Sequence, residues 1–442
     1  MEGNSIEGED HHVISIHRLT STMQLKILET PRLLSNQAGR STCSIFRVPQ
    51  SLIEINGKSY QPLIVSIGPY HHGEKHLQMI QEHKWRFLGS LVSRTQTRGL
   101  GLEHYLNAIE PLEDKARESY SEVIGLGTDE FVEMMVLDGC FIVELFRMVG
   151  RQVRVEEDDP IFSMSWIFPF LTRDLLKLEN QLPYFVLQTL FDLSKMPGED
   201  TGPSLATLAL KFFDNMMERP NEVISRYHNL DGKHLLDLFR SSFIPSNLEE
   251  PEKSNSSSQV IQCVVKLRRA GIKFKPGTAD SFLDIKFRNG VLEIPTITID
   301  DFTGSFFLNC VAFEQCNKHC SNHMTTYATL MDCIINTPKD VWFLCDDNII
   351  ENYFGTDAEV AQFFNNLGKD VSFDIDRCYL SKLFDDVNQY YRDDWHVQWA
   401  SFKHTYFETP WSFISALAAL ILLILTVAQT FFTIYPYYIH RS

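Results

Sequence analysis

The chain has 442 residues, which is long enough for two ordinary domains or one large one. Hydrophobic residues make up 44% and charged residues 22%, so the composition excludes a disordered or fibrous chain. Acidic residues outnumber basic ones by 57 to 40, and the net charge of −17 repels phosphate backbones. No run of basic residues offsets that charge, so we expect no nucleic-acid partner.

In chain order, the sequence predicts an N-terminal arm over residues 1–40 and a helical body over 41–408. The arm is polar and has no apolar run, so we expect no signal peptide there. Two short strand-like runs follow at 44–48 and 63–67. Apolar residues at helical spacing then predict helices at 74–95, 102–124, 129–149, 161–193 and 204–217.

The second half of the body contains a predicted linker and a predicted β-hairpin. Residues 244–259 are rich in Ser, Pro and Glu, which favours a flexible linker. After a helix at 260–270, the turn Asn289-Gly290 predicts a hairpin at 283–294, with Phe287 opposite Leu292. Further helices are predicted at 306–320, 325–335 and 359–367. The expected fold is therefore mainly α with a small β component.

Residues 409–435 predict a transmembrane helix at the C-terminal end. They carry no charge after Thr409, and the apolar stretch 413–434 would cover roughly 33 Å of a bilayer core about 30 Å thick. The residues expected to span are Phe413, Leu417, Leu420, Leu423, Leu425 and Phe431. Residues 436–442 would be a short tail. We expect a single-pass protein with a cytosolic body, on the plasma membrane or an endomembrane.

Small residues in the predicted span leave self-association open. Ser412 and Ala416, like Ser415 and Ala419, lie four apart, which would let two such helices approach closely. Simple lipid-facing small side chains are the alternative. The expected partners are therefore a membrane and protein partners whose identity the sequence does not give, and association with a second copy of the chain stays open.

Two clusters contain side chains that can bind metal ions. The first is His71, His72, His76 and His83, and the second is Cys316, His319, Cys320 and His323. Neither has the two separated ligand pairs that are typical of a zinc site, so we expect no metal. Gly57-Lys58-Ser59 resembles the end of a phosphate loop, but the first glycine of that motif is replaced by Leu52, so we expect no cofactor.

Four carboxylates lie within apolar helical runs: Asp138, Glu144, Glu179 and Glu314. Such groups often cap helix ends or accept hydrogen bonds from nearby backbone, and we favour this structural role. A pair of carboxylates can also act as general acid and base, as in glycosidases. No catalytic residue is assigned.

Several segments together resemble one family. They are FRVPQSLIEINGKSYQPLIVSIGPYHHG (46–73), HKWRFL (83–88), MVLDGCFIVELF (135–146), DLLKLENQLPYFVL (174–187), LEIPTITID (292–300), VAFEQ (311–315) and ETPWSFISALAALILLILTVAQT (408–430). In this order they resemble the plant domain-of-unknown-function family 247 over about 43–435. The resemblance implies a plant protein that ends in a membrane helix and has no established catalytic residues.

The resemblance also bears on function. Some grass members of the family act as male determinants of self-incompatibility, and others are linked to growth or stress responses. The leading interpretation is therefore a membrane-anchored recognition or signalling module that acts through protein partners. A membrane-bound hydrolase or transferase using the buried carboxylates is the alternative, and a purely structural tether is a third. The balance is against an enzyme.

Overall fold

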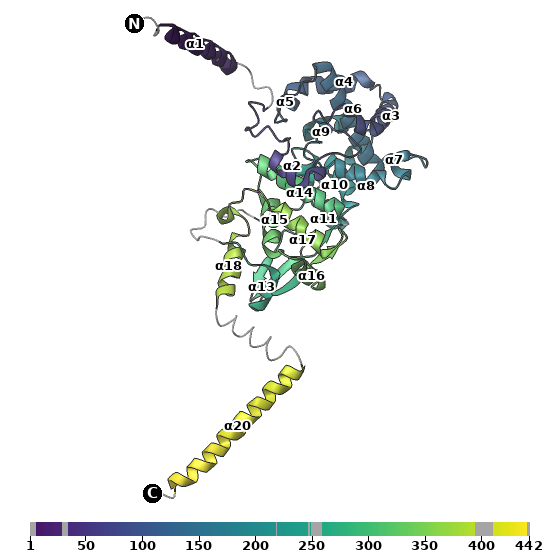
Figure 1. Cartoon of the computed structure of the whole chain (residues 1–442). Helices are drawn as coiled ribbons and strands as arrows, with labels where there is room; N and C mark the ends of the chain where they lie inside the picture. The colour runs from purple at the N-terminus through teal and green to yellow at the C-terminus, as the bar shows by residue number, and fades with distance from the viewer. Residues whose placement is uncertain are drawn as a thin grey trace.

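The structure is a computed structural model that describes residues 6–28, 34–217, 219–245, 248, 259–393 and 410–439. It is mainly helical with a small sheet component, as the sequence predicted. In Figure 1 the body has helices α3 to α9 at its upper end, while α13, α16 and α18 lie at its lower end.

The upper part of the body is built around α6 (Thr128–Val149). Between Phe131 and Met148 every side chain of this helix except that of Glu133 is buried, as expected for a helix that is apolar on all sides. Its neighbours are α3 (Gln78–Gln96), α4 (Leu102–Ile109), α9 (Tyr184–Leu193) and α10 (Leu205–Asp214). The shorter helices here are α2 (Gln50–Asn56), α5 (Glu113–Arg117), α7 (Pro160–Ser163), α8 (Ile167–Asp174), α11 (Asn221–Ser225) and α12 (Leu235–Ser241).

The lower part is built around α14 (Asp301–Cys316), whose phenylalanines join an aromatic cluster with α12. α14 packs against α15 (His323–Ile334) and α17 (Asp357–Leu367). The lower part also contains α13 (Val264–Arg269), α16 (Pro338–Asp346) and α18 (Ser381–Arg392). Single 3-10 turns occur at Gly57–Ser59, Lys75–Leu77, Glu110–Leu112, Glu199–Thr201 and Ile375–Arg377. The two parts share one continuous hydrophobic core.

Two small sheets lie in the lower part. The first has the order β1-β3-β2, where β1 (Lys273–Gly277) runs parallel to β3 (Val291–Pro295) and β2 (Lys286–Arg288) runs antiparallel to it. The second pairs β4 (Ile297–Ile299) with β5 (Ile350–Asn352) in parallel. The predicted hairpin is confirmed: Phe287 faces Leu292, and Asn289 and Gly290 both have positive φ, as its two-residue turn requires.

The helix predicted at 102–124 is divided into α4, a 3-10 turn and α5, and it ends at Arg117. Two further predictions for the upper part are wrong. The runs 44–48 and 63–67 are extended but do not form strands, apart from one isolated bridge between Ile45 and Tyr120. The predicted helix 161–193 is broken into α7, α8 and α9, and residues 175–183 form a turn between the last two. The two differences are linked, because side chains from that turn bind the 63–67 run and the end of the 44–48 run.

At the C-terminal end the structure has a helix, α20 (Pro410–Ile439). Within the residues that the structure describes, however, no helix combines the length and the apolar character needed to cross a membrane. A span needs about 20 predominantly apolar residues in succession. The described side chains of α20 are apolar without interruption only over 417–425, and then include Thr426, Gln429, Thr430 and Thr433.

The predicted transmembrane helix is therefore wrong, and the predicted single-pass localisation with a cytosolic body fails with it. Of the residues expected to span, those with described side chains are exposed on α20: Leu417, Leu420, Leu423, Leu425 and Phe431. The side chain of Phe413 lies outside the described ones. Most of the predicted linker 244–259 also lies outside them, and the predicted arm 1–40 contains α1 (Ile6–Leu28).

Two glycines with left-handed backbone give a matched test of the packing between the extended runs and the 175–183 turn. A Cβ on Gly68 (φ +73°) would lie 2.6 Å from the Gln181 carbonyl oxygen, whereas a Cβ on Gly99 (φ +78°) would meet nothing within 4 Å. We expect Gly68→Ala to lower the free energy of unfolding by about 2–4 kcal/mol, and Gly99→Ala by about 1–2 kcal/mol from backbone strain alone. Urea unfolding of both variants measures the difference, and equal losses would contradict the close packing.

Candidate functional site

The turn between α8 and α9 is the main polar feature of the body. α8 ends at Asp174, whose carbonyl accepts a hydrogen bond from the Asn180 side chain, and α9 starts at Tyr184 directly after Pro183. We refer to residues 174–181, which are the last residue of α8 and the first seven residues of the 175–183 turn, as the 174–181 turn. Its side chains are buried, and they bind backbone from distant parts of the chain.

Asp174 binds the extended run that sequence patterns had suggested was a strand. Its carboxylate accepts hydrogen bonds from the N–H groups of Leu63, Ile64 and Val65, at 2.7–3.1 Å. These amides have no sheet neighbour, so the carboxylate replaces the strand that would otherwise pair with them. A buried N–H group without a partner would cost stability, and Asp174 removes that cost.

Two amide side chains continue the same task. Asn180 accepts a hydrogen bond from the Ile67 N–H group at 2.6 Å and donates to the carbonyls of Val65 and Asp174. Gln181 donates to the carbonyls of Leu175 and Lys177, and it accepts from the Leu236 N–H group in α12. The turn therefore connects the 63–67 run to α8 and α12.

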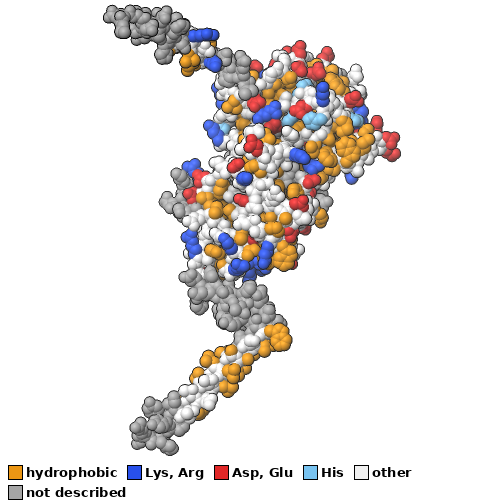
Figure 2. Space-filling view, in the orientation of Figure 1, with side chains coloured by type: hydrophobic (Ala, Val, Ile, Leu, Met, Phe, Trp, Pro, Cys, Tyr) orange, Lys and Arg blue, Asp and Glu red, His pale blue; other side chains and the backbone are white. Residues whose placement is uncertain are grey.

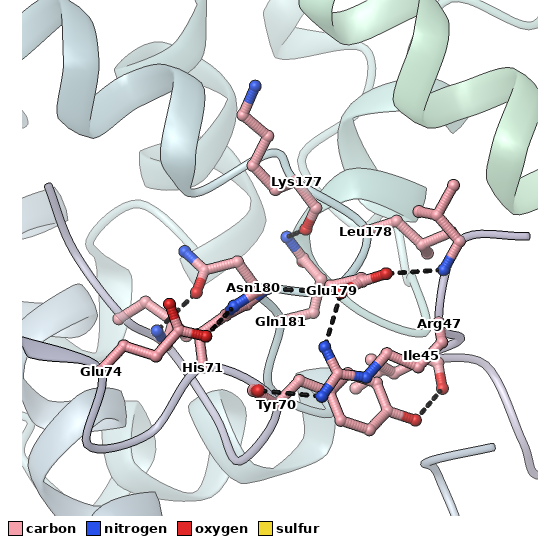
Figure 3. Close-up of polar contacts among 12 residues, drawn as sticks. Ile45, Arg47, Tyr70, His71, Glu74, Lys177, Leu178, Glu179, Asn180 and Gln181 are labelled. Carbon is pink, nitrogen blue, oxygen red and sulfur yellow. Dashed lines mark hydrogen bonds and ion pairs between the residues drawn. The ribbon is translucent and has the colours of Figure 1, made fainter. Parts of the chain in front are cut away.

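Glu179 binds the other extended run (Figure 3). Its carboxylate accepts hydrogen bonds from the Val48 N–H group and from Nη1 of Arg47, both at 2.7 Å. Arg47 also donates to the Tyr70 carbonyl, and its guanidinium stacks over the Tyr70 ring at 4.3 Å. These charge-assisted contacts hold the end of the 44–48 run, while at its start the Ser44 and Ile45 N–H groups donate to the Ser119 carbonyl.

His71 lies between two carboxylates in the same network. Its Nδ1 atom is 2.8 Å from the Glu74 carboxylate, and its Nε2 atom is 3.4 Å from Glu179. A His between two acids is a common arrangement for proton transfer. Here His71 is buried, and Glu179 is already held by Arg47 and the Val48 N–H group. The three side chains therefore contact other groups of the protein rather than a substrate.

The charges in the turn respond to burial in different ways. Burial opposes ionisation of Glu179, but its interactions with His71, the Val48 N–H group and Arg47 outweigh this effect and lower its pKa. Burial raises the pKa of Asp174 despite its three backbone donors. Burial also lowers the pKa of Lys177 to about 8, and its ammonium group donates to the Ser59 carbonyl and the Ser305 hydroxyl.

Asp138, on the buried helix α6, pairs with a buried cation. Its carboxylate accepts hydrogen bonds from Nζ of Lys84 on α3, at 2.6 Å, and from the Gly68 N–H group, at 2.8 Å. Lys84 also donates to the Ser66 carbonyl. Both side chains are at most 3% exposed, so removing either one would leave an unpaired charge in the core.

Glu144, further along α6, is held by Arg94 of α3. The two guanidinium nitrogens of Arg94 donate to the two carboxylate oxygens at 2.5 and 2.7 Å. This two-point contact joins α3 and α6 a second time, with Arg94 and Glu144 each further along its helix than Lys84 and Asp138. Glu144 is fully buried and Arg94 is partly exposed.

Glu314 joins α14 to α12 and to the start of α15. It accepts hydrogen bonds from Nη1 of Arg240 and from the N–H groups of Met324 and Thr325, at 2.7–3.1 Å. Those amides belong to the first turn of α15, where backbone donors have no partner inside the helix. Arg240 also binds Asp237 on α12. Burial raises the pKa of Glu314.

The surroundings of the four predicted carboxylates favour a role in holding the fold together over a role in acid–base catalysis. All four predicted carboxylates contact cations or backbone donors inside the protein, and these contacts leave little freedom for proton transfer to a substrate. Cavities of about 420, 750 and 470 Å³ open on the described surface, and none of the four carboxylates lines them. Among the described residues no group of three or more His, Cys, Asp or Glu side chains could hold a metal ion.

Sequence reasoning missed the partners of these carboxylates, and two of them carry a usable signal. Lys84 replaces an apolar residue at helical spacing between Ile80 and Leu88, so its position predicts burial and therefore an anionic partner. Arg240 likewise follows Leu236 by four residues on a buried helix face. Asp174 and Asn180 bind backbone more than 100 residues away, and no local pattern indicates such contacts.

Together, the fold and this network define a mainly helical protein whose buried carboxylates hold loops and helix ends in place. The model of the plant family of unknown function DUF247 matches residues 45–425, so the chain belongs to that family, as its motifs predicted. It is 41% identical over 430 residues to the UPF0481 protein At3g47200 of Arabidopsis thaliana, covering 92% of this chain and 89% of the relative.

The putative UPF0481 protein At3g02645 of the same plant is more distant. It is 24% identical over 489 residues, which cover 88% of this chain and 90% of that relative. No solved structure matches the chain. The family model and the first relative therefore establish the family of the chain, and neither specifies an activity.

The role of Glu179 can be tested by removing its charge. Glu179→Gln should lower the free energy of unfolding by about 1–3 kcal/mol, because the amide cannot accept from both Arg47 and the Val48 N–H group as a carboxylate does. Glu157→Gln, at an exposed acid, should change it by less than about 0.5 kcal/mol. Chemical denaturation of both variants gives the comparison, and equal stabilities would show that the Glu179 contacts contribute little.

His234, at the start of α12, makes stability depend on pH. It is fully buried; Nε2 donates to the Ser44 carbonyl, and Nδ1 accepts from the Asp237 N–H group. Burial lowers its pKa to about 4, so the folded protein holds the neutral ring. As pH falls from about 6.5 to about 4, the unfolded chain takes up a proton first, and about 2–3 kcal/mol of stability is lost.

The variant His234→Asn keeps a cap for α12 but does not titrate. Urea unfolding should therefore show a smaller loss of stability between about pH 7 and pH 4.5 for the variant than for the wild type. Other groups titrate in both proteins, so the difference between the two profiles is the measurement. Parallel profiles would contradict a buried neutral His234.

Proposed function

We propose that the protein is a recognition or signalling module that acts by binding protein partners. The main support is the state of its buried carboxylates, which are bound by internal cations and backbone donors. A network of this kind gives a rigid body with fixed surfaces. Rigid surfaces favour recognition because a partner then loses less conformational freedom on binding.

The alternative, a hydrolase or transferase that uses these carboxylates, has less support. A catalytic acid and base must lie in an accessible cleft within reach of the same substrate bond. Glu144 is fully buried against Arg94, and Glu314 is fully buried against Arg240. Neither group can reach a substrate without breaking an ion pair that holds two helices together.

Proximity labelling in plant cells tests the proposal. The full chain is fused to a labelling enzyme and compared with the labelling enzyme alone. A second fusion carries Glu144→Met with Arg94→Met, which replaces the ion pair by apolar side chains and often preserves stability. We expect a reproducible set of proteins to be enriched with the wild type and kept with the double variant, because the pair is internal.

Two outcomes would count against a recognition module. Absence of any protein enriched over the labelling enzyme alone would remove the proposal. Hydrolysis of glycoside or ester substrates by the purified wild type, but not by the folded double variant, would instead favour the enzyme. Circular dichroism confirms that the double variant is folded before either comparison is made.

A further inference from the structure

The three-stranded sheet at the lower end of the body presents a basic face. Its outward positions carry Lys273 and Lys275 on β1 and Lys286 and Arg288 on β2, and all four side chains are exposed. Figure 2 shows blue side chains gathered at this end of the body, in the region of α13 in Figure 1. We call these four side chains the basic face.

The strand register makes the face continuous. Lys273 pairs with Val291, which pairs with Arg288, so these residues form one row across the sheet. Lys275, Glu293 and Lys286 form the next row. Neighbouring strands lie about 4.8 Å apart, and residues two apart along a strand are separated by about 6.6 Å. The cations therefore form a regular grid that no sequence run reveals.

Side chains on the opposite side of the sheet pack against the core and α18, and they hold the strands that carry the four cations. Phe274 and Leu292 are buried in the core, and Phe287 packs edge-on against Tyr390 of α18 at 5.8 Å. The hairpin turn is held as well, because a Cβ on Gly290 would lie 2.5 Å from the Tyr390 hydroxyl. The basic face is thus carried by a rigid element rather than by a mobile loop.

The charges on this face are mostly uncompensated. Lys286 pairs with Asp284, but Lys273, Lys275 and Arg288 form no ion pair with the residues that the structure describes. This is unexpected in a chain with 57 acidic and 40 basic residues, where an anionic neighbour is easy to supply. A cluster of unpaired like charges repels itself, and an anionic partner would relieve that repulsion.

We propose that the basic face binds an acidic segment of a partner protein, in extended conformation and with acidic residues at alternate positions. Acidic side chains two residues apart in an extended peptide have the same spacing as Lys273 and Lys275. The inference rests on the proposed recognition function and names the chemistry of one partner surface. It also revises the sequence prediction, which found no basic patch because these residues come from separate strands.

A protein segment fits this face better than a nucleic acid does. Glu293 lies between Lys275 and Lys286, where it would repel a continuous phosphate backbone, whereas a peptide can place an uncharged residue there. The aromatic side chains of these strands, Phe274 and Phe287, face the core and α18, so they cannot stack on bases. The net charge of −17 further disfavours a long polyanion.

Fluorescence anisotropy with the purified full-length protein tests the proposal. The probe is a fluorescein-labelled peptide in which Glu and Ser alternate, and the matched probe has the same composition with all Glu residues in one block. We expect tighter binding of the alternating peptide, and weaker binding as salt rises from about 0.05 M to about 0.5 M. A labelled single-stranded oligonucleotide of equal charge should bind more weakly than the peptide.

Variants locate the binding site. Lys273→Glu with Arg288→Glu reverses one row of the grid and should weaken peptide binding by about tenfold or more. Lys58→Glu, at an exposed lysine on the 3-10 turn after α2, makes a control reversal and should leave affinity within about twofold. Glu293→Gln removes the only acid in the two rows and should tighten binding about twofold to threefold.

The outcomes separate this inference from the proposed function. The inference is overturned if the alternating peptide does not bind, if both reversals weaken it equally, or if the oligonucleotide binds more tightly. Lysines that only keep sheet edges from pairing with other strands would give the first of these results. If the inference is overturned in this way, the proposed recognition function still stands, because the proteins found by proximity labelling do not depend on the peptide result. A second copy of this chain could also supply the acidic segment. Light scattering would then show a dimer of the wild type that Lys273→Glu with Arg288→Glu abolishes, and this result would overturn the assignment to a partner protein.

Discussion

The body depends on satisfying backbone amides that have no neighbouring strand. The 44–48 and 63–67 runs are extended and buried except at Arg47 and Leu63, yet they belong to no sheet. Asp174 and Asn180 supply the acceptors for the 63–67 run. Glu179 accepts from Val48 in the other run, whose Ser44 and Ile45 N–H groups donate to the Ser119 carbonyl. The turn therefore sets the position of the 63–67 run and of Gly68, and it holds the 44–48 run together with residues 119–121. The position of Gly68 in turn places α6, because the Gly68 N–H group donates to Asp138 of that helix.

Buried ionic pairs connect the helices in a second way. Lys84 with Asp138 and Arg94 with Glu144 join α3 to α6 at two levels. Such pairs add little net stability over apolar packing, but a shift of either helix would leave a charge unpaired in the core. They therefore favour one alignment of the two helices. The basic face differs in kind, because its charges are exposed and largely unpaired.

Much of the helical fold was predictable, since apolar periodicity placed α3, α6, α10, α15 and α17 close to their observed bounds. The hairpin followed from a two-residue turn whose geometry is local. The strand-like runs were misjudged because their pairing partners are side chains more than 100 residues away. The C-terminal prediction relied on apolar composition over a long window, and no described helix meets the requirement for a span. For the carboxylates, burial was predictable. The apolar spacing around Lys84 and Arg240 marked two of the partner cations as buried, but the sequence did not show which cation meets which carboxylate.

The long reach of these hydrogen bonds has a consequence for synthesis. The amide of Leu63 leaves the ribosome 111 residues before Asp174, the side chain that will accept its hydrogen bond. At translation rates of about 5–20 residues per second, that interval lasts roughly 5–20 s. During it, the N–H groups of Leu63, Ile64 and Val65 lack the acceptor that they have in the folded protein. The nascent N-terminal segment is therefore a natural client for chaperones, and the upper body can close only once α9 has been made.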